Sequence, residues 1–137
     1  MVDPVLFSSK SFEWETPASI YNDLNAEFHF TLDPCATTEN HKCEKYFTKN
    51  DDGLAQSWDA DRVFMNPPYG RGIDKWIEKA SLSKNLVVCL LPARTDTIWF
   101  HKYVYGKATI RFLKGRIRFG GSRTGAPFPS MVVIFNE

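Results

Sequence analysis

Four adjacent residues, Asn66-Pro67-Pro68-Tyr69, have the side chains and backbone needed to act on an amino group. The exocyclic amine of a nucleobase is a poor nucleophile because its lone pair is delocalised into the ring. The side-chain oxygen of Asn66 and the main-chain oxygen of Pro67 could each accept one amine proton and so expose that lone pair. Proline suits this role because its φ is fixed and it has no N–H to compete. Tyr69 offers an aromatic face on which a flipped base could stack.

A second motif, Asp33-Pro34-Cys35-Ala36, lies at the end of another predicted strand. The segment 28–33 alternates apolar and polar residues and stops at a proline, which predicts a strand with Asp33 at its carboxyl end. The apolar segment 62–65 predicts a strand that ends at Asn66, because two prolines then remove two hydrogen-bond donors. Open α/β sheets bind ligands at the carboxyl ends of their strands. Both strand ends are therefore candidate sites.

The rest of the chain alternates between helical and extended patterns. Thr16-Pro17 predicts a helix start, because Thr can cap a helix and Pro in its first turn wastes no donor. The segment 86–92 is apolar throughout, which is typical of a central strand covered on both faces. The other predicted elements are a helix over 73–80, a helix capped by Thr95-Asp96, and strands at 46–48, 108–113, 116–119 and 131–135. This alternation indicates an α/β fold with a mostly parallel sheet.

The length and composition are those of one folded domain. The 137 residues are 43% hydrophobic and 24% charged, so we expect a single core and no separate recognition domain. The longest apolar run is far shorter than the ~20 residues of a membrane-spanning helix, so no membrane partner is expected. Three cysteines without a C-x-x-C pair do not fit a disulfide framework and predict a cytoplasmic location.

The net charge of +1 hides an uneven distribution. Residues 1–66 contain five Lys or Arg against twelve Asp or Glu, whereas residues 67–137 contain twelve against four. A basic face would favour phosphate-rich partners, because neutralising phosphates releases counterions. The alternative is that the two halves interleave in space and leave a surface of mixed charge.

Taken together, the motifs and their order resemble the phage-type Dam family of DNA N-6-adenine methyltransferases. The matching segments are Trp14-x-Thr16-Pro17, Leu32-Asp33-Pro34-Cys35-Ala36, Tyr46-Phe47-Thr48, Asp52-Gly53-Leu54, Trp58, Val63-Phe64-x-Asn66-Pro67-Pro68-Tyr69, Leu91-Pro92-Ala93-Arg94-Thr95-Asp96-Thr97 and Gly115-Arg116-Ile117. The resemblance implies a compact Rossmann-like methyltransferase fold whose sheet has an antiparallel C-terminal part. It also implies methyl transfer from S-adenosylmethionine to the exocyclic amine of adenine in double-stranded DNA, in the host cytoplasm if the chain is phage-encoded.

The resemblance carries roles to individual positions. It assigns catalysis to Asn66, Pro67, Pro68 and Tyr69, and it implies no metal. It assigns cofactor binding to Trp14, Thr16, Pro17, Asp33, Pro34, Cys35, Ala36, Asp51 or Asp52, and Asn66. In this assignment Thr16 and Pro17 lie along the methionine end of the cofactor, and one of the two aspartates addresses its adenine amine. The first motif lacks the glycine-rich turn of larger relatives, which lets the backbone approach the ligand.

Base selection would then come from loops around the site. Candidate DNA-binding residues are the basic side chains after the catalytic turn, after the central strand and in the C-terminal hairpin region, namely Arg71, Lys75, Arg94, Lys114, Arg116, Arg118 and Arg123. Arg can read guanine in the major groove, whereas Lys or Arg on phosphates only positions the protein. So short a recognition surface suggests a short target or a homodimer.

Two other functions stay open at this point. One is a catalytically inactive DNA-binding module on a methyltransferase fold, suggested by the missing glycine turn. The other is an amino-methyltransferase acting on RNA or protein, since related turns methylate such acceptors. The basic second half of the chain favours a nucleic acid over a protein.

Three further interpretations are weaker on spacing. Cys35 does not follow the catalytic strand, where an enzyme that methylates a cytosine ring carbon needs its thiolate. Cys35, His41 and Cys43 lack the usual spacing of zinc ligands and a fourth partner. Asp33 could merely cap a turn, although the resemblance favours a ligand role.

Overall fold

One mixed sheet organises the chain in the computed structural model, which describes residues 15–121 and 123–137. Its six strands within those residues lie in the order β2-β1-β3-β4-β6-β5. Their bounds are β1 Leu32–Asp33, β2 Lys45–Tyr46, β3 Val63–Met65, β4 Val87–Pro92, β5 Thr109–Phe112 and β6 Ser130–Phe135.

The directions of the strands confirm the predicted sheet. β1 pairs in parallel with β2 and β3, and β3 pairs in parallel with β4. β6 is antiparallel to both of its neighbours, β4 and β5. Of the strands described, β6 alone therefore runs against the others, and the antiparallel pairings all lie in the C-terminal part of the chain.

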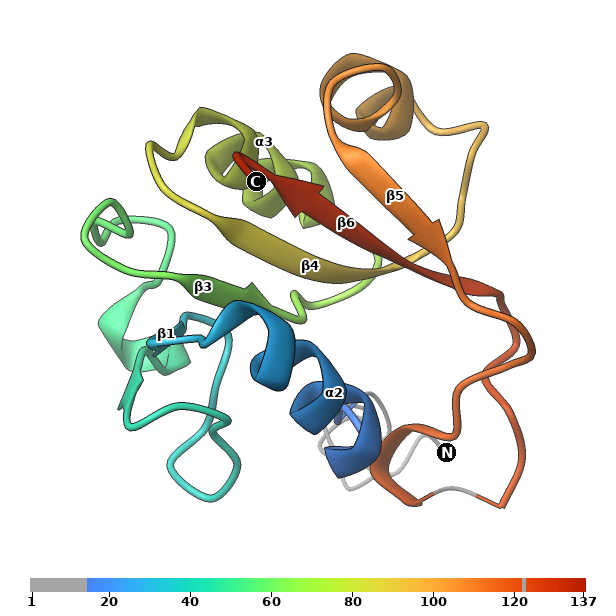
Figure 1. The fold of residues 1–137 in the computed structure, drawn as a ribbon, viewed down its shortest axis with the longest axis horizontal. Helices are drawn as coiled ribbons and strands as arrows, with labels where there is room; N and C mark the ends of the chain where they lie inside the picture. The colour runs from blue at the N-terminus through green and yellow to red at the C-terminus, as the bar shows by residue number, and fades with distance from the viewer. Residues whose placement is uncertain (1–14, 122) are drawn as a thin grey trace, which may run out of the picture.

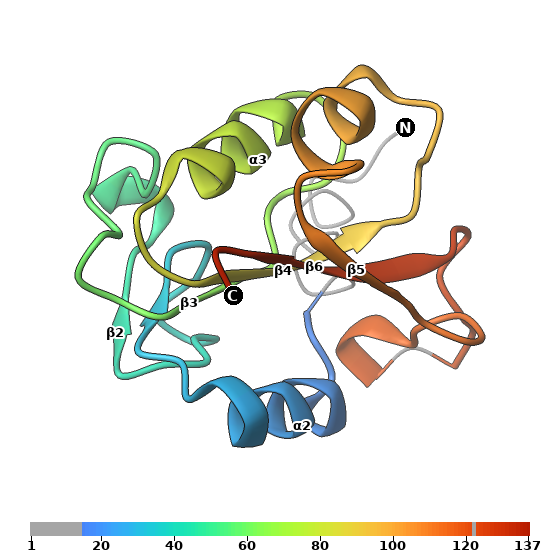
Figure 2. The same cartoon turned by 45° about the horizontal axis from the view of Figure 1, so that its top comes forward.

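Helices cover both faces of this sheet, as Figures 1 and 2 show. Helix α2 (Ala18–Phe28) lies on one face, and α3 (Ile73–Leu82) lies on the other with the π-helical turn η2 (Phe100–Val104). Because side chains alternate along a strand, β4 contributes Val87, Cys89 and Leu91 to the core under α3, while Val88 and Leu90 join the core under α2. All six residues of β4 are buried, as predicted for a central strand.

The start of α2 differs from the prediction. Pro17, not Thr16, occupies the N-cap position, and no side chain caps the helix. The carbonyl of Pro17 accepts the N–H groups of Ile20 and Tyr21, each at 3.1 Å. The hydroxyl of Thr16 is turned away from the helix and accepts a hydrogen bond from Asn66 instead.

The predicted strand 28–33 is wrong over most of its length. Phe28 is the last residue of α2, since it extends the buried stripe of Tyr21 and Leu24 at helical spacing. His29, at φ 55°, ends the helix, and only residues 32 and 33 pair as β1. The buried residues Phe28, Phe30 and Leu32 alternate with the exposed residues His29 and Thr31, and this alternation mimics a strand.

The predicted strand 116–119 is wrong, because residues 116–118 form a loop and Phe119 begins the 3₁₀ turn η3 (Phe119–Gly121). Gly115 and Gly120 adopt positive φ values of 77° and 58°, so the chain turns before and after the segment. Its backbone bonds to distant loops rather than to a strand: the carbonyl of Ile117 accepts from Ala126 N, and Gly120 N donates to the carbonyl of Glu15. Ile117 and Phe119 still point into the core, which explains the strand-like pattern.

The helix after β4 begins later than Thr95-Asp96. Thr97 caps it, since its hydroxyl accepts the N–H of Phe100 at 3.3 Å. Trp99, Phe100 and Val104 are buried, and the turn widens to a π-helix in which Tyr105 N donates to Phe100 O at 2.8 Å. The remaining predicted elements, α3 and the strands at 46–48, 62–65, 108–113 and 131–135, are confirmed within one to three residues at each end.

Gly53 packs a second loop against the loop that follows β1. Its carbonyl accepts a hydrogen bond from Trp58 Nε1 at 2.9 Å, and an added Cβ would lie 2.5 Å from the carbonyl oxygen of Pro34. We therefore expect Gly53→Ala to lower the free energy of unfolding by about 1–3 kcal/mol, the usual cost of overpacking. Urea denaturation measures this, with exposed Ala55→Ser in the same segment as the control. An unchanged midpoint for Gly53→Ala would show that the two loops can separate freely.

Candidate active site

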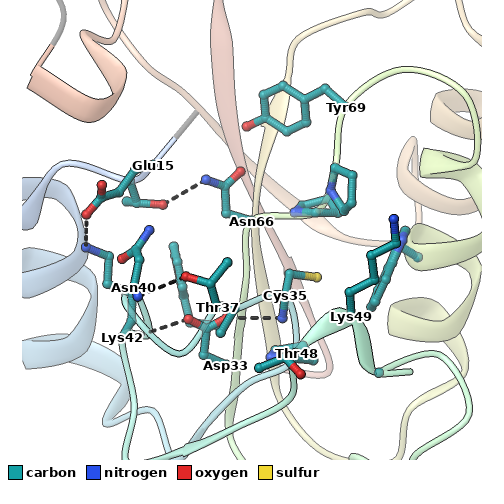
Figure 3. A pocket seen from close by; sticks show the side chains of 18 of the residues that line it. Glu15, Asp33, Cys35, Thr37, Asn40, Lys42, Thr48, Lys49, Asn66 and Tyr69 are labelled. Atoms are coloured by element: carbon teal, nitrogen blue, oxygen red, sulfur yellow. Dashed lines mark hydrogen bonds and ion pairs between the residues drawn. The ribbon is translucent and has the colours of Figure 1, made fainter. Parts of the chain in front are cut away.

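A cavity of about 600 Å³ opens at the carboxyl ends of β1 and β3. Pockets of this size are typical for small-molecule ligands. Figure 3 shows side chains from both strand ends and from the segments around residues 15, 40 and 49 converging on it. The lining residues are Glu15, Thr16, Asp33, Pro34, Cys35, Ala36, Thr37, Asn40, Lys42, Thr48, Lys49, Asp52, Gly53, Phe64, Asn66, Pro67, Pro68, Tyr69 and Trp76. The structure thus brings the two predicted motifs together in one cavity.

Asn66 lies at the centre of this wall, directly after β3. Its Nδ2 donates a hydrogen bond of 3.0 Å to the hydroxyl of Thr16. Pro67 is buried and Pro68 exposed, and neither continues the ladder of β3. The amide of Asn66 is therefore anchored through its nitrogen.

The ring of Tyr69 is fixed from two directions. Its hydroxyl donates to the carbonyl of Leu90 in β4 at 3.0 Å. Its ring makes edge contacts with Phe128 and Phe119, at centroid distances of 5.5 Å and 6.1 Å. Burial raises the pKa of the Tyr69 phenol well above its ordinary value, so the hydroxyl remains a donor at neutral pH. A ring held in this way is ready to receive a planar group without first being ordered.

Asp33 holds the loop after β1 in shape. Its Oδ1 accepts the N–H of Cys35 at 3.2 Å and its Oδ2 accepts the N–H of Lys42 at 2.9 Å. Burial raises the pKa of the carboxyl, an effect opposed by these two hydrogen bonds. Asp33 therefore caps the turn after β1 and also lines the cavity.

The thiol of Cys35 also faces a low-dielectric environment. Burial raises its pKa well above the ordinary value, with a smaller contribution from Asp33. A thiol in this state is a poor nucleophile at neutral pH. The Sγ of Cys43 instead lies 3.4 Å from the Tyr21 hydroxyl. Within residues 15–121 and 123–137, no three His, Cys, Asp or Glu side chains lie close enough together to hold a metal ion.

Charged groups of both signs also line the cavity. Lys42 Nζ lies 3.9 Å from Glu15 Oε1, and both side chains are partly buried. Lys49 and Asp52 belong to the lining as well. Asp51 does not line the cavity, because its Oδ2 accepts from the backbone N–H and the hydroxyl of Thr48.

Several lining residues were missed by the sequence reasoning. Glu15, Asn40, Lys42 and Lys49 lie in weakly patterned segments that carry no motif, so nothing local distinguishes them. Trp76 was predicted only as part of the α3 core, whereas it also lines the cavity. Its ring stacks on that of Trp58, with 6.1 Å between the ring centroids. Of the predicted cofactor residues, Pro17 does not line the cavity, and Trp14 lies outside the described residues.

The predicted DNA-binding residues fall into groups. Arg94 follows β4 and lies 5.6 Å from the ring centroid of Phe128, which itself contacts Tyr69. The exposed residues Lys114, Arg116, Arg118 and Arg123 belong to the segment between β5 and β6, and exposed Arg71 follows the catalytic turn. Arg116 donates to the carbonyl of Ala126 at 3.3 Å and so also braces that segment. Lys75 lies apart, in a groove along α3 beside Trp58.

Comparison with known proteins places these features in context. A family model described as DNA N-6-adenine-methyltransferase (Dam) matches residues 6–137. A DNA N-6-adenine-methyltransferase of Haemophilus phage HP1 is 29% identical over 133 residues, covering 89% of this chain and 77% of the phage protein. A DNA N-6-adenine-methyltransferase of Escherichia phage T1 is 34% identical over 92 residues, covering 64% of this chain and 38% of the T1 protein.

No helix in the described part of the chain has the length and apolarity to span a bilayer.

The buried carboxyl of Asp33 should make stability depend on pH in a defined direction. Its pKa is raised from 3.8, so above pH 3.8 the folded chain keeps a proton that the unfolded chain loses. The stabilisation from this group is complete below the unfolded pKa and is lost as pH rises through the folded one. We expect the free energy of unfolding of the wild type, relative to Asp33→Asn, to fall as pH rises above 3.8. Urea denaturation at increasing pH measures the difference.

Asp23→Asn provides the control, because Asp23 is exposed on α2. A relative stability that increases with pH at position 33 would show that the two backbone hydrogen bonds outweigh burial.

Proposed function

Because the chain belongs to the DNA N-6-adenine-methyltransferase (Dam) family, we propose that it methylates the exocyclic amine of adenine in double-stranded DNA, with S-adenosylmethionine as methyl donor. The observation that carries this proposal is the single cavity shared by Asn66-Pro67-Pro68-Tyr69 and the loop after β1. An amine acceptor and a cofactor pocket must adjoin for methyl transfer, and these two motifs do so.

The cavity suits the chemical character of S-adenosylmethionine. The cofactor carries an ammonium and a carboxylate at one end, and Glu15 and Lys42 offer a partner of each charge on one side of the pocket. We assign its binding to Thr16, Asp33, Pro34, Cys35, Ala36 and Asp52, with Asn66 beside it. Asp52 is preferred to Asp51 because only Asp52 lines the cavity. Pro17 would act by placing Thr16, and Trp14 remains a predicted contact.

The catalytic motif would prepare the adenine amine for reaction. When bound, S-adenosylmethionine supplies a methyl carbon on a positively charged sulfur, which is a good leaving group. Asn66 Oδ1 and the carbonyl oxygen of Pro67 would each accept a hydrogen bond from one N–H of the amine, which leaves the lone pair of the nitrogen directed toward the methyl carbon. Tyr69 stacks on the flipped base and helps offset the few kcal/mol of unstacking. Alignment and electrostatic complementarity then supply most of the acceleration.

One methyltransferase domain, residues 1–137, would perform both catalysis and DNA recognition. We regard its sheet as a compact Rossmann-like arrangement, because five of the described strands share one direction and the site lies at their carboxyl edge. Base selection then depends on the loops after β3 and β4 and between β5 and β6. The three cysteines are unpaired, which suits the reducing cytoplasm.

DNA would bind across the basic residues near Tyr69. Arg94, Arg116, Arg118 and Arg123 belong to the loops that surround the Tyr69–Phe128 contact, and Arg71 follows the catalytic turn. Lys114 would extend the positive surface toward flanking phosphates, whereas Lys75, which lies apart along α3, would contact only a longer DNA duplex. Since this surface is small, we further propose that two copies act together as a homodimer on a site longer than one copy can read.

Asn66→Ala should strongly reduce methylation while leaving the cofactor pocket in place. The variant removes one of the two proton acceptors, so we expect kcat to fall by roughly 10²-fold or more, as for the loss of a preorganised polar group in other active sites. Nucleoside mass spectrometry of treated DNA measures N6-methyladenine, and calorimetry measures S-adenosylmethionine binding. Asn50→Ala, at an exposed position of the 3₁₀ turn η1 (Lys49–Asp51), is the control. Full turnover by Asn66→Ala would refute the role, and wild-type methylation of RNA or protein in place of DNA would refute the acceptor.

Arg118→Ala should weaken DNA binding without changing stability. Its side chain is exposed, so we expect lower affinity at moderate salt and a salt dependence of log K reduced by about 1 if it contacts one phosphate. Fluorescence anisotropy at several salt concentrations measures both quantities. Lys84→Ala is the charge-matched control. Lys84 is exposed and precedes the amino end of β4, whereas the cavity lies at the carboxyl ends of the parallel strands. Equal losses in the two variants would indicate a general charge effect rather than a DNA face.

A further inference from the structure

Thr16 is held in a defined place from both sides. Only 3% of its surface is exposed, although it precedes the first described helix. The carbonyl of Glu15 accepts the N–H of Gly120 at 2.9 Å, and the carbonyl of Pro17 begins the hydrogen bonds of α2. The segment 15–17 is therefore tied to the loop between β5 and β6 on one side and to a helix on the other. Its hydroxyl reaches across 50 residues of sequence to Nδ2 of Asn66, at 3.0 Å.

In this bond the Asn66 amide presents its nitrogen to the Thr16 hydroxyl, so its oxygen lies on the other side of the amide. A primary amide has one acceptor oxygen and one donor nitrogen, and a half-turn about its last bond exchanges them. Only the oxygen can accept a hydrogen bond from the N–H of an incoming amine, because the amide nitrogen is itself a donor. In Figure 3 the nitrogen of Asn66 points toward the segment of Glu15, and the oxygen points toward the side on which Tyr69 lies.

We propose that Thr16 is a positioning residue, whose hydroxyl holds the Asn66 amide with its oxygen turned toward the methyl-accepting amine. The inference rests on the proposed function, because it concerns the same amine. The capping role expected of Thr16 is not available to explain its burial, since no side chain caps α2. Thr16 acts on the reaction through Asn66, and its hydroxyl is needed even when the cavity is otherwise unchanged.

Three variants test this in the full-length protein. Thr16→Val keeps the shape of the side chain and removes the hydroxyl, whereas Thr16→Ser keeps the hydroxyl. Thr109→Val makes the same change as the first at an exposed position of β5, the far edge of the sheet. We measure kcat and KM on duplex DNA, the Kd for S-adenosylmethionine by calorimetry, and the thermal unfolding midpoint.

The expected pattern separates positioning from folding and from cofactor binding. Thr16→Val should lose roughly 10- to 100-fold in kcat, the range associated with misplaced reacting groups, and this loss should exceed any change in KM or in the cofactor Kd that follows from its place in the cavity lining. Thr16→Ser should recover most of that loss, and Thr109→Val should match the wild type. A Thr16→Val enzyme with wild-type kcat, or one whose loss lies wholly in cofactor Kd or in unfolding, overturns the inference.

A double-mutant cycle with Asn66→Asp isolates the orientation of the amide. A carboxylate has two acceptor oxygens, so its half-turn changes nothing. The loss caused by Thr16→Val should therefore be smaller in the Asn66→Asp background than in the wild type, and an equal loss in both overturns the inference. If Asn66→Asp has no turnover, the comparison of Thr16→Val with Thr16→Ser decides alone. A wild-type chain that methylates no DNA refutes the proposed function, whereas a failure confined to the Thr16 variants refutes only this role.

Discussion

The parallel pairing of β1 with β3 is the constraint on which the site depends. Leu32 pairs with Val63, so both strands point the same way and end at the same edge of the sheet. A proline follows each strand end and prevents the ladder from continuing, so the chain diverges there and leaves a cavity between the two loops. β3 in turn is held by β4, which is buried along its whole length. The position of Asn66 is thus set by the most buried part of the molecule, as a reacting group requires.

The sequence predicts this central part well because its signals are local. A continuous apolar run predicts β4, a period of 3.6 residues predicts α3, and twin prolines mark the end of β3. Each signal lies within about ten residues and needs no knowledge of the rest of the chain. The two motifs at strand ends could therefore be placed on one edge of the sheet before the structure was known.

Other parts of the fold and site could not be predicted, because contacts distant in sequence determine them. Residues 116–119 have a strand-like pattern, yet Ile117 bonds to Ala126 and the following Gly120 bonds to Glu15, instead of a neighbouring strand. Thr16 has the right type for a helix cap, yet its hydroxyl serves Asn66. Lys42 lies in a segment without periodicity and reaches the pocket only because Asp33 accepts its N–H. In each case the local pattern allows two outcomes, and a long-range hydrogen bond selects one.

The polarity of the cavity explains why its catalytic motif has a neutral amide, Asn66, rather than a carboxylate. The amide, unlike a carboxylate, must be held in one orientation. Burial raises the pKa of the Cys35 thiol and the Tyr69 phenol, so the wall around Asn66 disfavours negative charge. A carboxylate at position 66 would need no orientation, but it would be desolvated in this wall, and desolvation of an unpaired charge is costly. An amide avoids that cost and in exchange must present the correct one of its two ends. The hydroxyl of Thr16 contributes to this with a neutral hydrogen bond to the amide nitrogen, while the charged groups Glu15 and Lys42 pair with each other in the lining. The neutral side chain of Asn66 and its hydrogen bond to Thr16 therefore belong together, because an amide at this position is useful only when its orientation is held.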